Sequence, residues 1–539
     1  MTTHATAEIC RGPARLAGML ANERPGSGVR RGEVIAALSL ATDLAMGQPV
    51  EFALKSCVLA TRIGKMLGLR PEELSEIYYH ALLRYIGCNA ETHAMAALFG
   101  DELDFRRDFA LIDMGRAAEM ASLVFGYLRR AHAGTGMFAM VAGVARGLVA
   151  SQKAAAENIA GHCEVAERLA ERLSLSAGVR RNLGQIYERW DGRGLPRGLK
   201  GEAIAPAVRV VSFAQDAIVL RAAYGVDAAH AKLEARAGSA YEPRLMERYL
   251  KRADELTAGL DDTSWDDVLA LEPEPQAMLS QAEFDAACLA MADVADLKSP
   301  YSVGHSRAVA RLAAEAARRC GLPEADATDL ARAGLLHDIG QVGVPVRIWL
   351  KAGALNDSEW EQVRLHSYYG ERVLARPAAL ARLGAIVAQH HERLDGSGYH
   401  RGARGGALTP HGRILAAAEA YQNKVEPRPH RAAMPAQAAA DALKREARDG
   451  KLGAEAVGAV LAAAGHAVPV HQEMVAGLTA REIDVLRAIA RGHSTKEIAR
   501  TLGISPKTVD NHTQNVYAKI GVKTRGGATL FAIEHGLCG

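Results

Sequence analysis

The sequence predicts an all-α protein of several domains, and three observations support this. The chain has 539 residues, too many for one compact domain. Apolar residues make up 49% but aromatic residues only 5%, and Ala, Leu and Arg dominate the long segments. Apolar side chains recur at helical spacing, as at Leu54, Val58 and Ile63, until a Gly-Leu-Arg-Pro break at residues 68–71.

Charge and cysteine usage narrow the class of protein. A net charge of +3 excludes a protein that coats nucleic acid over its whole surface, so any basic surface must be local. The seven cysteines form no CxxC pair, which is typical of reduced thiols in a cytosol. The N-terminus lacks a signal-peptide core, and the longest uncharged apolar run, Ala133–Ala145, is too short to cross a bilayer. We therefore expect a soluble, cytoplasmic protein with no membrane partner.

A long internal repeat indicates a domain duplication. Residues Trp190–Gly198 match Leu394–Gly402 at an offset of 204, and Ala81–Gly87 match Gly334–Gly340 at an offset of 253. The two offsets predict an insertion of about 49 residues in the first copy, within about residues 89–150. A repeat of this length is a duplicated domain rather than a solenoid unit.

The repeat and two linker-like stretches divide the chain. The first linker is acidic and contains proline, and the second joins the repeat to a locally basic end. The predicted parts are a lead-in at 1–32, a first repeat domain at 33–256, an acidic linker at 257–277, a second repeat domain at 278–465, a linker at 466–477 and a C-terminal domain at 478–539.

Within the second repeat domain, a candidate ligand set of five imidazoles and two carboxylates is spread over about 115 residues. Nitrogen and carboxylate ligands suit Zn, Fe, Mn or Ni better than Ca or Mg, provided that several helices converge. Asp338 directly follows His337, so its carboxylate is placed to bridge two metals, which can together promote displacement at phosphorus. The candidate metal ligands are His305, His337, Asp338, His366, His390, His391 and Glu419.

The alternative is that these are ordinary core or surface histidines. The first copy argues against it, because it has lost nearly all of the set together. Arg84 and Tyr85 replace His337 and Asp338, Ile186 and Tyr187 replace His390 and His391, Gln215 replaces Glu419, His162 alone survives, and His305 has no convincing counterpart. We therefore expect the first copy to keep the framework without the metal chemistry.

With these motifs, residues 278–465 resemble the HD-GYP subgroup of HD-superfamily phosphohydrolases, and residues 34–250 resemble a degenerate version. The resemblance implies helical domains that hold two or three metals and hydrolyse cyclic di-GMP. It implies a metal-ligand role for the seven residues, with Glu419 where the family has Asp. Tyr301 stands near the extra acidic ligand of trinuclear members, so we expect two divalent ions, Fe or Mn, with Zn or Ni as alternatives.

Two departures from the family pattern bear on catalysis. The lysine of the family's HDIGK motif is Gln341, and the proline of its GYP motif is His400. The first change removes a cation suited to binding phosphate or to proton transfer. The candidate catalytic residues are His337, Asp338 and Gln341, and we expect ligand binding with weak or no hydrolysis.

The C-terminal domain is predicted to hold four short helices. Thr479 to Glu482 and Ser494 to Glu497 form capping boxes, and Ser505 is an N-cap before a proline at the first helical position. Nine Lys and Arg residues face five Asp and Glu residues in this stretch. The alternative to a DNA-binding domain is a solvated, charged helix in a protein-binding bundle.

These residues are similar to the LuxR-type helix-turn-helix domain over nearly its whole length. The matching stretches are Leu478–Glu482, Lys496–Ala499 and Ile504–His512. The recognition helix is then about Pro506–Ile520, and its side chains divide into base-reading and phosphate-binding sets. The base-reading candidates are Asp510, Asn511 and Gln514, and the phosphate-binding candidates are Lys507, Thr508, His512, Lys519, Lys523 and Arg525.

Three functions remain open from the sequence. The first is a transcriptional regulator that binds a cyclic dinucleotide or another phosphate ester; the resemblance implies a homodimer on double-stranded DNA. The second is an active cyclic di-GMP phosphodiesterase with a DNA-binding tail. The third is a scaffold in which both copies have become interaction surfaces. Metal content separates the third from the others, and turnover separates the first from the second.

Overall fold

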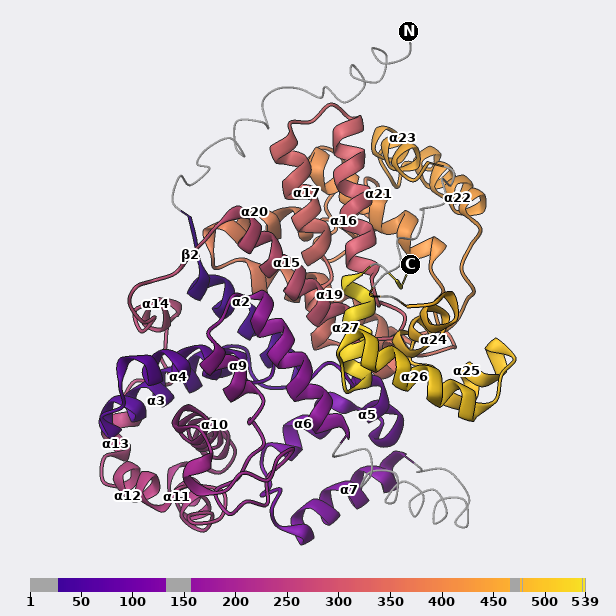
Figure 1. Ribbon diagram of the computed structural model, residues 1–539. Coiled ribbons are helices and arrows are strands. Elements are labelled where there is room, and N and C mark those ends of the chain that lie inside the picture. Colours follow the sequence, from indigo (N-terminus) through magenta and orange to yellow (C-terminus); the bar gives the residue numbers. More distant parts are fainter. Residues whose placement is uncertain (1–27, 132–156, 466–475, 477, 536, 539) are drawn as a thin grey trace. The chain divides into compact units, whose positions relative to one another are not determined.

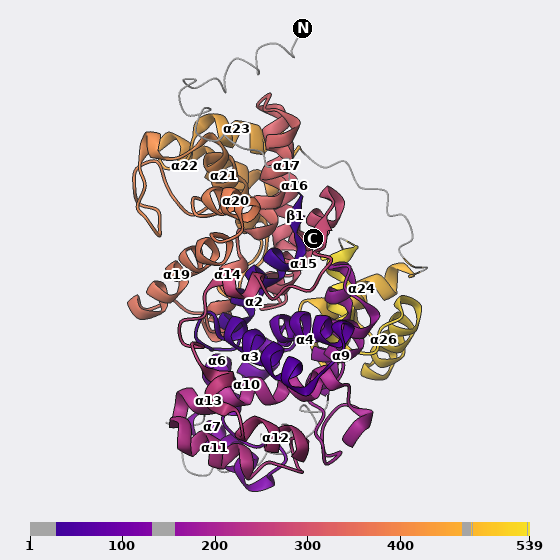
Figure 2. The same ribbon diagram turned by 90° about the vertical axis from the view of Figure 1, so that its left-hand side faces the viewer.

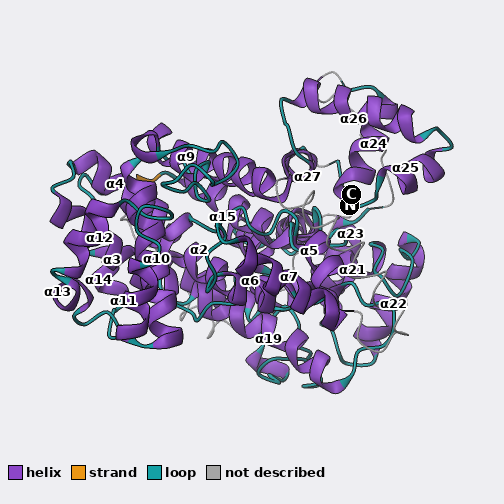
Figure 3. Cartoon of the chain, turned by 90° about the horizontal axis from the view of Figure 1, so that it is seen from below, coloured by secondary structure: helices purple, strands orange, loops and turns teal. Residues whose placement is uncertain are grey.

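The computed structural model describes residues 28–131, 157–465, 476, 478–535 and 537–538, and their regular secondary structure is almost entirely helical (Figures 1 and 3). The predicted all-α class is confirmed. Among the described residues, the named strands are β1 (Val29–Arg30) and β2 (Met278–Leu279), which pair with each other. No described helix is long and apolar enough to span a membrane. Most of the predicted lead-in, the Ala133–Ala145 run and nearly all of the predicted linker at 466–477 lie outside the described residues.

The chain separates into two compact units. Among the described residues, those within 30–279 and 345–347 form the N-terminal unit, and the remainder, which includes Val29, forms the C-terminal unit. Residues 157–172 of the first unit are also helical. The elements between the two strands are α2 (Arg31–Ala45), α3 (Phe52–Leu67), α4 (Pro71–Leu83), α5 (Thr92–Phe99), α6 (Glu102–Phe109), α7 (Ala117–Ala131), α9 (Ala177–Leu183), η1 (Gly201–Ala203), α10 (Pro206–Tyr224), α11 (Val226–Glu234), α12 (Pro243–Leu250), α13 (Ala253–Thr257) and α14 (Trp265–Leu269).

The packing of α3, α4 and α10 forms the centre of the N-terminal unit (Figure 2). Helix α3 ends at Gly68, whose φ of 75° is left-handed, and α4 begins with Pro71 at its first position. Both features are expected at helix boundaries. The predicted apolar face of α3, with Leu54, Val58 and Ile63, is buried.

The segment at 257–277, expected to be a linker, is instead packed within the N-terminal unit. Ser264 caps α14, and Trp265 and Val268 on this short helix are buried. Glu272 is 4% exposed because its carboxylate accepts hydrogen bonds from Arg30 at 2.7 Å and from the Gly32 backbone at 3.0 Å. The acidic composition suggested a solvated chain, but paired charge and one apolar turn bury the segment.

The helices that follow form the second repeat and the C-terminal end. Helices α16 and α17 lie side by side in Figures 1 and 2. The elements are α15 (Gln281–Asp296), α16 (His305–Arg319), α17 (Glu324–Leu336), η2 (Ile339–Gly343), α18 (Val346–Trp349), α19 (Asp357–Leu374), α20 (Ala378–Val387), η3 (Gly405–Ala407), α21 (Pro410–Val425), α22 (Ala436–Arg448), α23 (Ala454–Ala463), α24 (Ala480–Ala490), α25 (Thr495–Leu502), α26 (Pro506–Ile520) and α27 (Arg525–Glu534).

Matching backbone contacts occur in both repeats. A Cβ atom added to Gly87 would lie 2.0 Å from the carbonyl oxygen of His162, and one added to Gly340 would lie 2.0 Å from that of His366. Only glycine permits so close an approach. The same close backbone approach is therefore present in each unit, and it explains why the repeat retains this glycine.

A second shared feature is a loop held by a buried glutamate. Glu188 accepts hydrogen bonds from the backbone of Arg197 and Leu199, both at 2.8 Å. Glu392 accepts the corresponding bonds from Arg401 at 2.7 Å and Ala403 at 2.9 Å. The first copy thus keeps the framework of the second, although its ligand positions differ.

The last four helices have the predicted starts. Thr479 and Ser494 each form a capping box with the glutamate three residues later, and Ser505 caps α26. Their buried apolar residues form one core, which includes Leu486, Ile498, Val509 and Val516. The recognition helix predicted at about residues 506–520 coincides with α26.

Candidate metal centre and DNA-binding face

Helix ends and helix faces bring the seven predicted ligands together. His305 is the first residue of α16, His366 lies in α19 and Glu419 lies in α21. The other four follow helix ends: His337 and Asp338 follow α17, and His390 and His391 follow α20. Six of the seven are buried, and His391 is partly buried.

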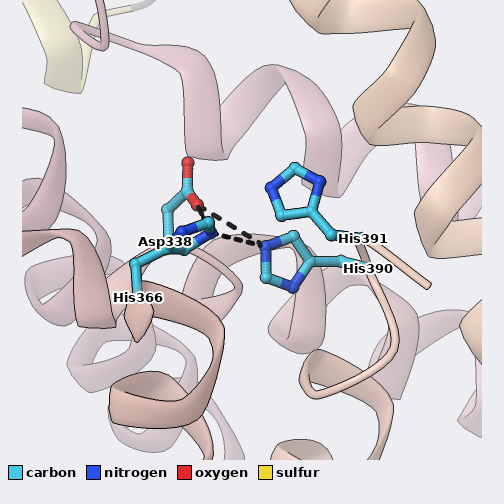
Figure 4. Close-up of side chains that lie close together, drawn as sticks. All are labelled: Asp338, His366, His390 and His391. Carbon is cyan, nitrogen blue, oxygen red and sulfur yellow. Dashed lines mark hydrogen bonds and ion pairs between the residues drawn. The ribbon is translucent and has the colours of Figure 1, made fainter. Parts of the chain in front are cut away.

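The side chains form two adjoining clusters that could each hold a metal ion. The first contains His305, His337 and Glu419; the Glu419 Oε2 atom lies 2.8 Å from His305 Nε2 and 3.5 Å from His337 Nε2. The second contains Asp338, His366, His390 and His391. Figure 4 shows the Asp338 carboxylate and the rings of His366 and His390 directed toward one another, with His391 beside them.

The Asp338 carboxylate lies between the clusters. Its Oδ2 atom is 3.2 Å from His337 Nε2 and 3.7 Å from His305 Nε2. Its Oδ1 atom is 3.5 Å from His366 Nε2 and 3.7 Å from His390 Nε2. One oxygen therefore faces each cluster, which is the arrangement that a bridging ligand requires.

Four of the imidazoles are oriented by a hydrogen bond at Nδ1. His337, His366 and His390 each contact the carbonyl oxygen three residues earlier, at 2.8, 2.5 and 2.6 Å. His305 Nδ1 lies 2.7 Å from the carboxylate of Glu426. Because Nδ1 donates in each pair, Nε2 is the ring atom that faces the cluster and would bind a metal ion.

The donor atoms converge, and His366 Nε2 lies within hydrogen-bond distance of His390 Nε2, at 3.1 Å. Among the described residues, His337 Nε2, Asp338 Oδ1 and Glu419 Oε2 are buried and have no hydrogen-bond partner. Buried polar atoms are rarely left unsatisfied, and such exceptions are expected where an ion belongs. The nitrogen and carboxylate donors, their burial and their orientation all fit divalent transition metals.

The pKa values of the histidines are shifted in opposite directions in the two clusters. Burial alone would lower the pKa of His305 and His337, but adjacent carboxylates raise the pKa of His337 to about 10 and that of His305 well above its usual range. Burial lowers the pKa of His390 to about 3 and that of His391 well below its usual range. Without metal, positive charge in this centre therefore gathers on the imidazoles nearest the carboxylates.

A cavity of about 550 Å³ opens onto the clusters. Its volume lies within the range of small-molecule sites. The lining includes His305, Asp338, His366, His391 and Glu419 from the clusters. Other lining residues are Tyr301, Gln341, Trp349, Lys351, Trp360, Tyr399 and Arg428.

Sequence reasoning missed Glu426, the carboxylate that holds His305. It directly follows α21, seven residues after Glu419, so two helical turns place both on one face. That spacing was the available signal. Arg428 Nη2 lies 3.2 Å from Glu426, which places a cation beside this carboxylate.

Some of the predicted DNA-binding side chains are exposed to solvent, and others contact residues of their own domain. Asp510, Asn511 and Gln514 on α26 are exposed. Lys507 and Lys523 are exposed, whereas Thr508 and His512 are partly buried. The Thr508 hydroxyl lies 2.8 Å from that of Ser505 and so belongs to the cap of α26.

Two predicted phosphate-binding cations also have partners inside the domain. Lys519 Nζ lies 2.6 Å from Glu482, the acidic residue of the first capping box. Arg525 donates to the carbonyl oxygens of Ile489 at 2.8 Å and His493 at 2.7 Å, which secures the end of α24. Both residues therefore contribute to the fold, in addition to any role at DNA.

Comparison with known families finds two matches. The HD domain family matches residues 150–245 and 290–455. The family described as bacterial regulatory proteins, luxR family, matches residues 476–532.

Individual relatives agree with the first match. The chain is 30% identical over 408 residues to 3'3'-cGAMP-specific phosphodiesterase 3 of Vibrio cholerae, covering 75% of this chain and 88% of that protein. It is 39% identical over 129 residues to a cyclic di-GMP phosphodiesterase of Thermotoga maritima, covering 24% and 35%. The crystal structure of a cyclic GMP-AMP-specific phosphodiesterase of V. cholerae superposes with a TM-score of 0.56 at 26% identity, covering 83% of this chain and all of that one.

Proposed function

Because the chain belongs to the HD-GYP-type branch of the HD-domain phosphohydrolases and ends in a LuxR-family DNA-binding domain, we propose that it is a metal-dependent, cyclic dinucleotide-responsive transcriptional regulator. In this proposal the second HD domain binds the ligand and hydrolyses it slowly or not at all. The Asp338 carboxylate carries the proposal, because it lies between two donor clusters that border the 550 Å³ cavity.

Two divalent ions are the proposed cofactors, Fe or Mn, with Zn or Ni as alternatives. His305, His337 and Glu419 would hold one ion, His366, His390 and His391 would hold the other, and Asp338 would serve both. Such ions polarise phosphoryl oxygens and lower the pKa of bound water. The protein residues keep each Nε2 atom aimed at the cluster through the Nδ1 contacts, including that of Glu426 with His305.

The cavity lining supports a cyclic dinucleotide as the ligand class. Trp349 and Trp360 line it, and Trp360 is 44% exposed. Indole rings are effective stacking surfaces for nucleobases. The relatives are phosphodiesterases named for 3'3'-cGAMP and cyclic di-GMP, two ligands of this class.

Charge at the cavity supports slow hydrolysis. Gln341 is neutral and lines the cavity where the family has a lysine. Two lining cations are already paired, Lys351 with Glu359 at 2.5 Å and Arg428 with Glu426 at 3.2 Å. Catalysis depends more than binding on charge that develops in the transition state, so a missing cation should slow turnover more than it weakens binding.

The contacts of His400, in the loop at residues 398–400, are compatible with ligand binding. Its Nε2 atom lies 3.1 Å from Glu371, while its neighbour Tyr399 lines the cavity. Tyr399 also stacks on His391, with ring centroids 4.7 Å apart. The loop therefore supports a proposed ligand through Tyr399, and the residue that replaces proline is paired with a carboxylate.

The C-terminal helices would bind double-stranded DNA. Asp510, Asn511 and Gln514 are the proposed base-reading residues, since all are exposed on α26. Lys507, which is exposed near the start of α26, would contact phosphate. We propose binding as a homodimer to an inverted repeat, as LuxR-type domains do.

An active cyclic di-GMP phosphodiesterase is the second candidate, favoured by the assembly of all seven donors in two clusters. Anaerobically purified full-length protein should be assayed for cyclic dinucleotide binding and turnover with and without Trp360→Ala. The regulator proposal predicts metal-dependent binding, weakened in the variant, with turnover well below about 1 per second. Turnover at or above that rate would establish the enzyme instead, and metal-bound protein without any cyclic dinucleotide affinity would refute both.

A further inference from the structure

We infer that the first HD domain, which lacks the metal ligands, binds a phosphate group through arginine. A cavity of about 100 Å³ lies at the position that corresponds to the metal centre, lined by Arg84, Tyr85, Ile186 and Tyr187. These residues replace His337, Asp338, His390 and His391 of the second copy. At about 30 Å³ per water, the volume suits one oxyanion and is too small for a dinucleotide.

Arg84 supplies the unsatisfied donors. Its Nη2 atom donates to the carbonyl oxygen of Ile186 at 3.1 Å. Its Nε and Nη1 atoms are buried and have no hydrogen-bond partner among the described residues. The ring of Tyr85 lies 5.6 Å from the guanidinium carbon, which offers a face to the cation but no acceptor for its N–H groups.

The balance of charge in this cavity is positive. Four arginines and three carboxylates line it. Arg189 is paired with Asp113 at 2.5 Å and Arg236 with Asp216 at 3.6 Å. The third carboxylate, Glu188, accepts two backbone N–H groups of its own loop.

The remaining two arginines, Arg84 and Arg106, form no ion pair with a carboxylate in the described part of this unit. Arg106 donates to the carbonyl oxygens of Ala45 and Cys88 and to the hydroxyl of Thr92. Arg84 has the single carbonyl contact described above. A buried guanidinium is costly without an anion, and its planar set of donors matches phosphate oxygens.

Other polar groups in the same region also lack partners. The Ser212 hydroxyl lines the cavity and has no hydrogen-bond partner among the described residues. Gln215, at the position of Glu419, is 1% exposed, and neither of its amide atoms is bonded to a described residue. A neutral amide in place of a carboxylate removes the negative charge that would repel an oxyanion.

The two copies would thus recognise the same chemical group by different means. The second would hold phosphate through metal ions, and the first through a fixed guanidinium where a metal ligand stood. The inference does not depend on the function proposed for the second domain, because no residue of the metal clusters takes part. The ligand is inorganic phosphate or the terminal phosphate of a small ester.

The test is calorimetric titration of the full-length chain with inorganic phosphate, after removal of metal by a chelator so that the second domain does not compete. We expect a Kd at or below about 1 mM. Arg84→Met should weaken binding about tenfold or more, since a charged hydrogen-bond partner is lost. Arg84→Lys should retain part of the affinity, and Arg193→Met, at an exposed residue that does not line the cavity, should leave it unchanged.

A parallel titration with 5'-GMP distinguishes the two sources of phosphate. Tighter binding of GMP with the same dependence on Arg84 identifies an ester, whereas binding of phosphate alone identifies the free ion. Folding of each variant is checked by circular dichroism, and Arg84→Lys carries the test if Arg84→Met does not fold. Absence of phosphate binding to the wild type, or equal binding by the wild type and Arg84→Met, would overturn the inference.

Discussion

Removing the Glu426 carboxylate should lower the affinity for one of the two metal ions and leave the affinity for the other unchanged. Its Oε2 atom is 2.7 Å from His305 Nδ1, and the His305 side chain is 2% exposed. Loss of such an outer-sphere partner typically costs 10- to 100-fold in metal affinity, which is about 1.4–2.7 kcal/mol. We expect this loss in Glu426→Ala, confined to the cluster with His337 and Glu419, because His366 is oriented separately by a backbone carbonyl.

The assay is competition for metal against a chromophoric chelator, fitted to two sites. Glu426→Gln keeps an oxygen that accepts from Nδ1, so it should retain most of the affinity that Glu426→Ala loses. Glu361→Ala is the matched control, since Glu361 is 69% exposed and pairs with Arg364 on the same helix. Unchanged affinity at both sites in Glu426→Ala would refute the reasoning, as would an equal loss in the Glu361 control.

Three further predictions concern turnover, DNA and acid stability. Gln341→Lys should raise cyclic dinucleotide turnover about tenfold or more by restoring a cation, and unchanged turnover by steady-state assay would count against the charge argument. In gel-shift titrations, Asn511→Ala should lose about 1–3 kcal/mol at the cognate site only, whereas Lys507→Ala should weaken all sequences alike; equal effects would refute the assignment of the reading face. Hydrogen bonds from Lys519 and from the cap backbone lower the pKa of Glu482 from 4.5 to about 2. The ionised carboxylate therefore stabilises the fold above pH 4.5, and this stabilisation is lost as the pH falls toward 2. Glu482→Gln should lower the free energy of unfolding, measured by thermal denaturation at pH 7, by about 1 kcal/mol and should reduce the loss of stability in acid. If the loss of stability in acid is unchanged in this variant, the Glu482–Lys519 pair is not its cause.

The helical fold was predictable because local signals were strong. Capping boxes at Thr479 and Ser494 and the glycine break after Leu67 each depend on a few neighbouring residues. The internal repeat was equally visible, since Gly87 and Gly340 are required by the same backbone approach. The segment at 257–277 was less predictable, because the burial of Glu272 depends on Arg30, which lies 242 residues earlier.

The composition of the metal clusters could be read from the sequence, but their geometry could not. The sequence motifs identified all seven donors. The way in which Asp338 directs one oxygen to each cluster could not be predicted, because it depends on how α17 ends and on packing against α19 and α21. Glu426 was within reach through its spacing of seven residues from Glu419. The contacts of Lys519 and Arg525 with α24 were not, because they join residues that are distant in sequence.

The central claim is that the second HD domain holds two metal ions bridged by Asp338, while the first holds none. Elemental analysis of anaerobically reconstituted full-length protein tests it most directly, with Asp338→Ala as the variant and the exposed Asp357→Ala as the control. We predict about two ions per chain for the wild type and the control, and a loss of both ions in Asp338→Ala. A wild type without stoichiometric metal, or an Asp338→Ala protein that keeps both ions, would contradict the account.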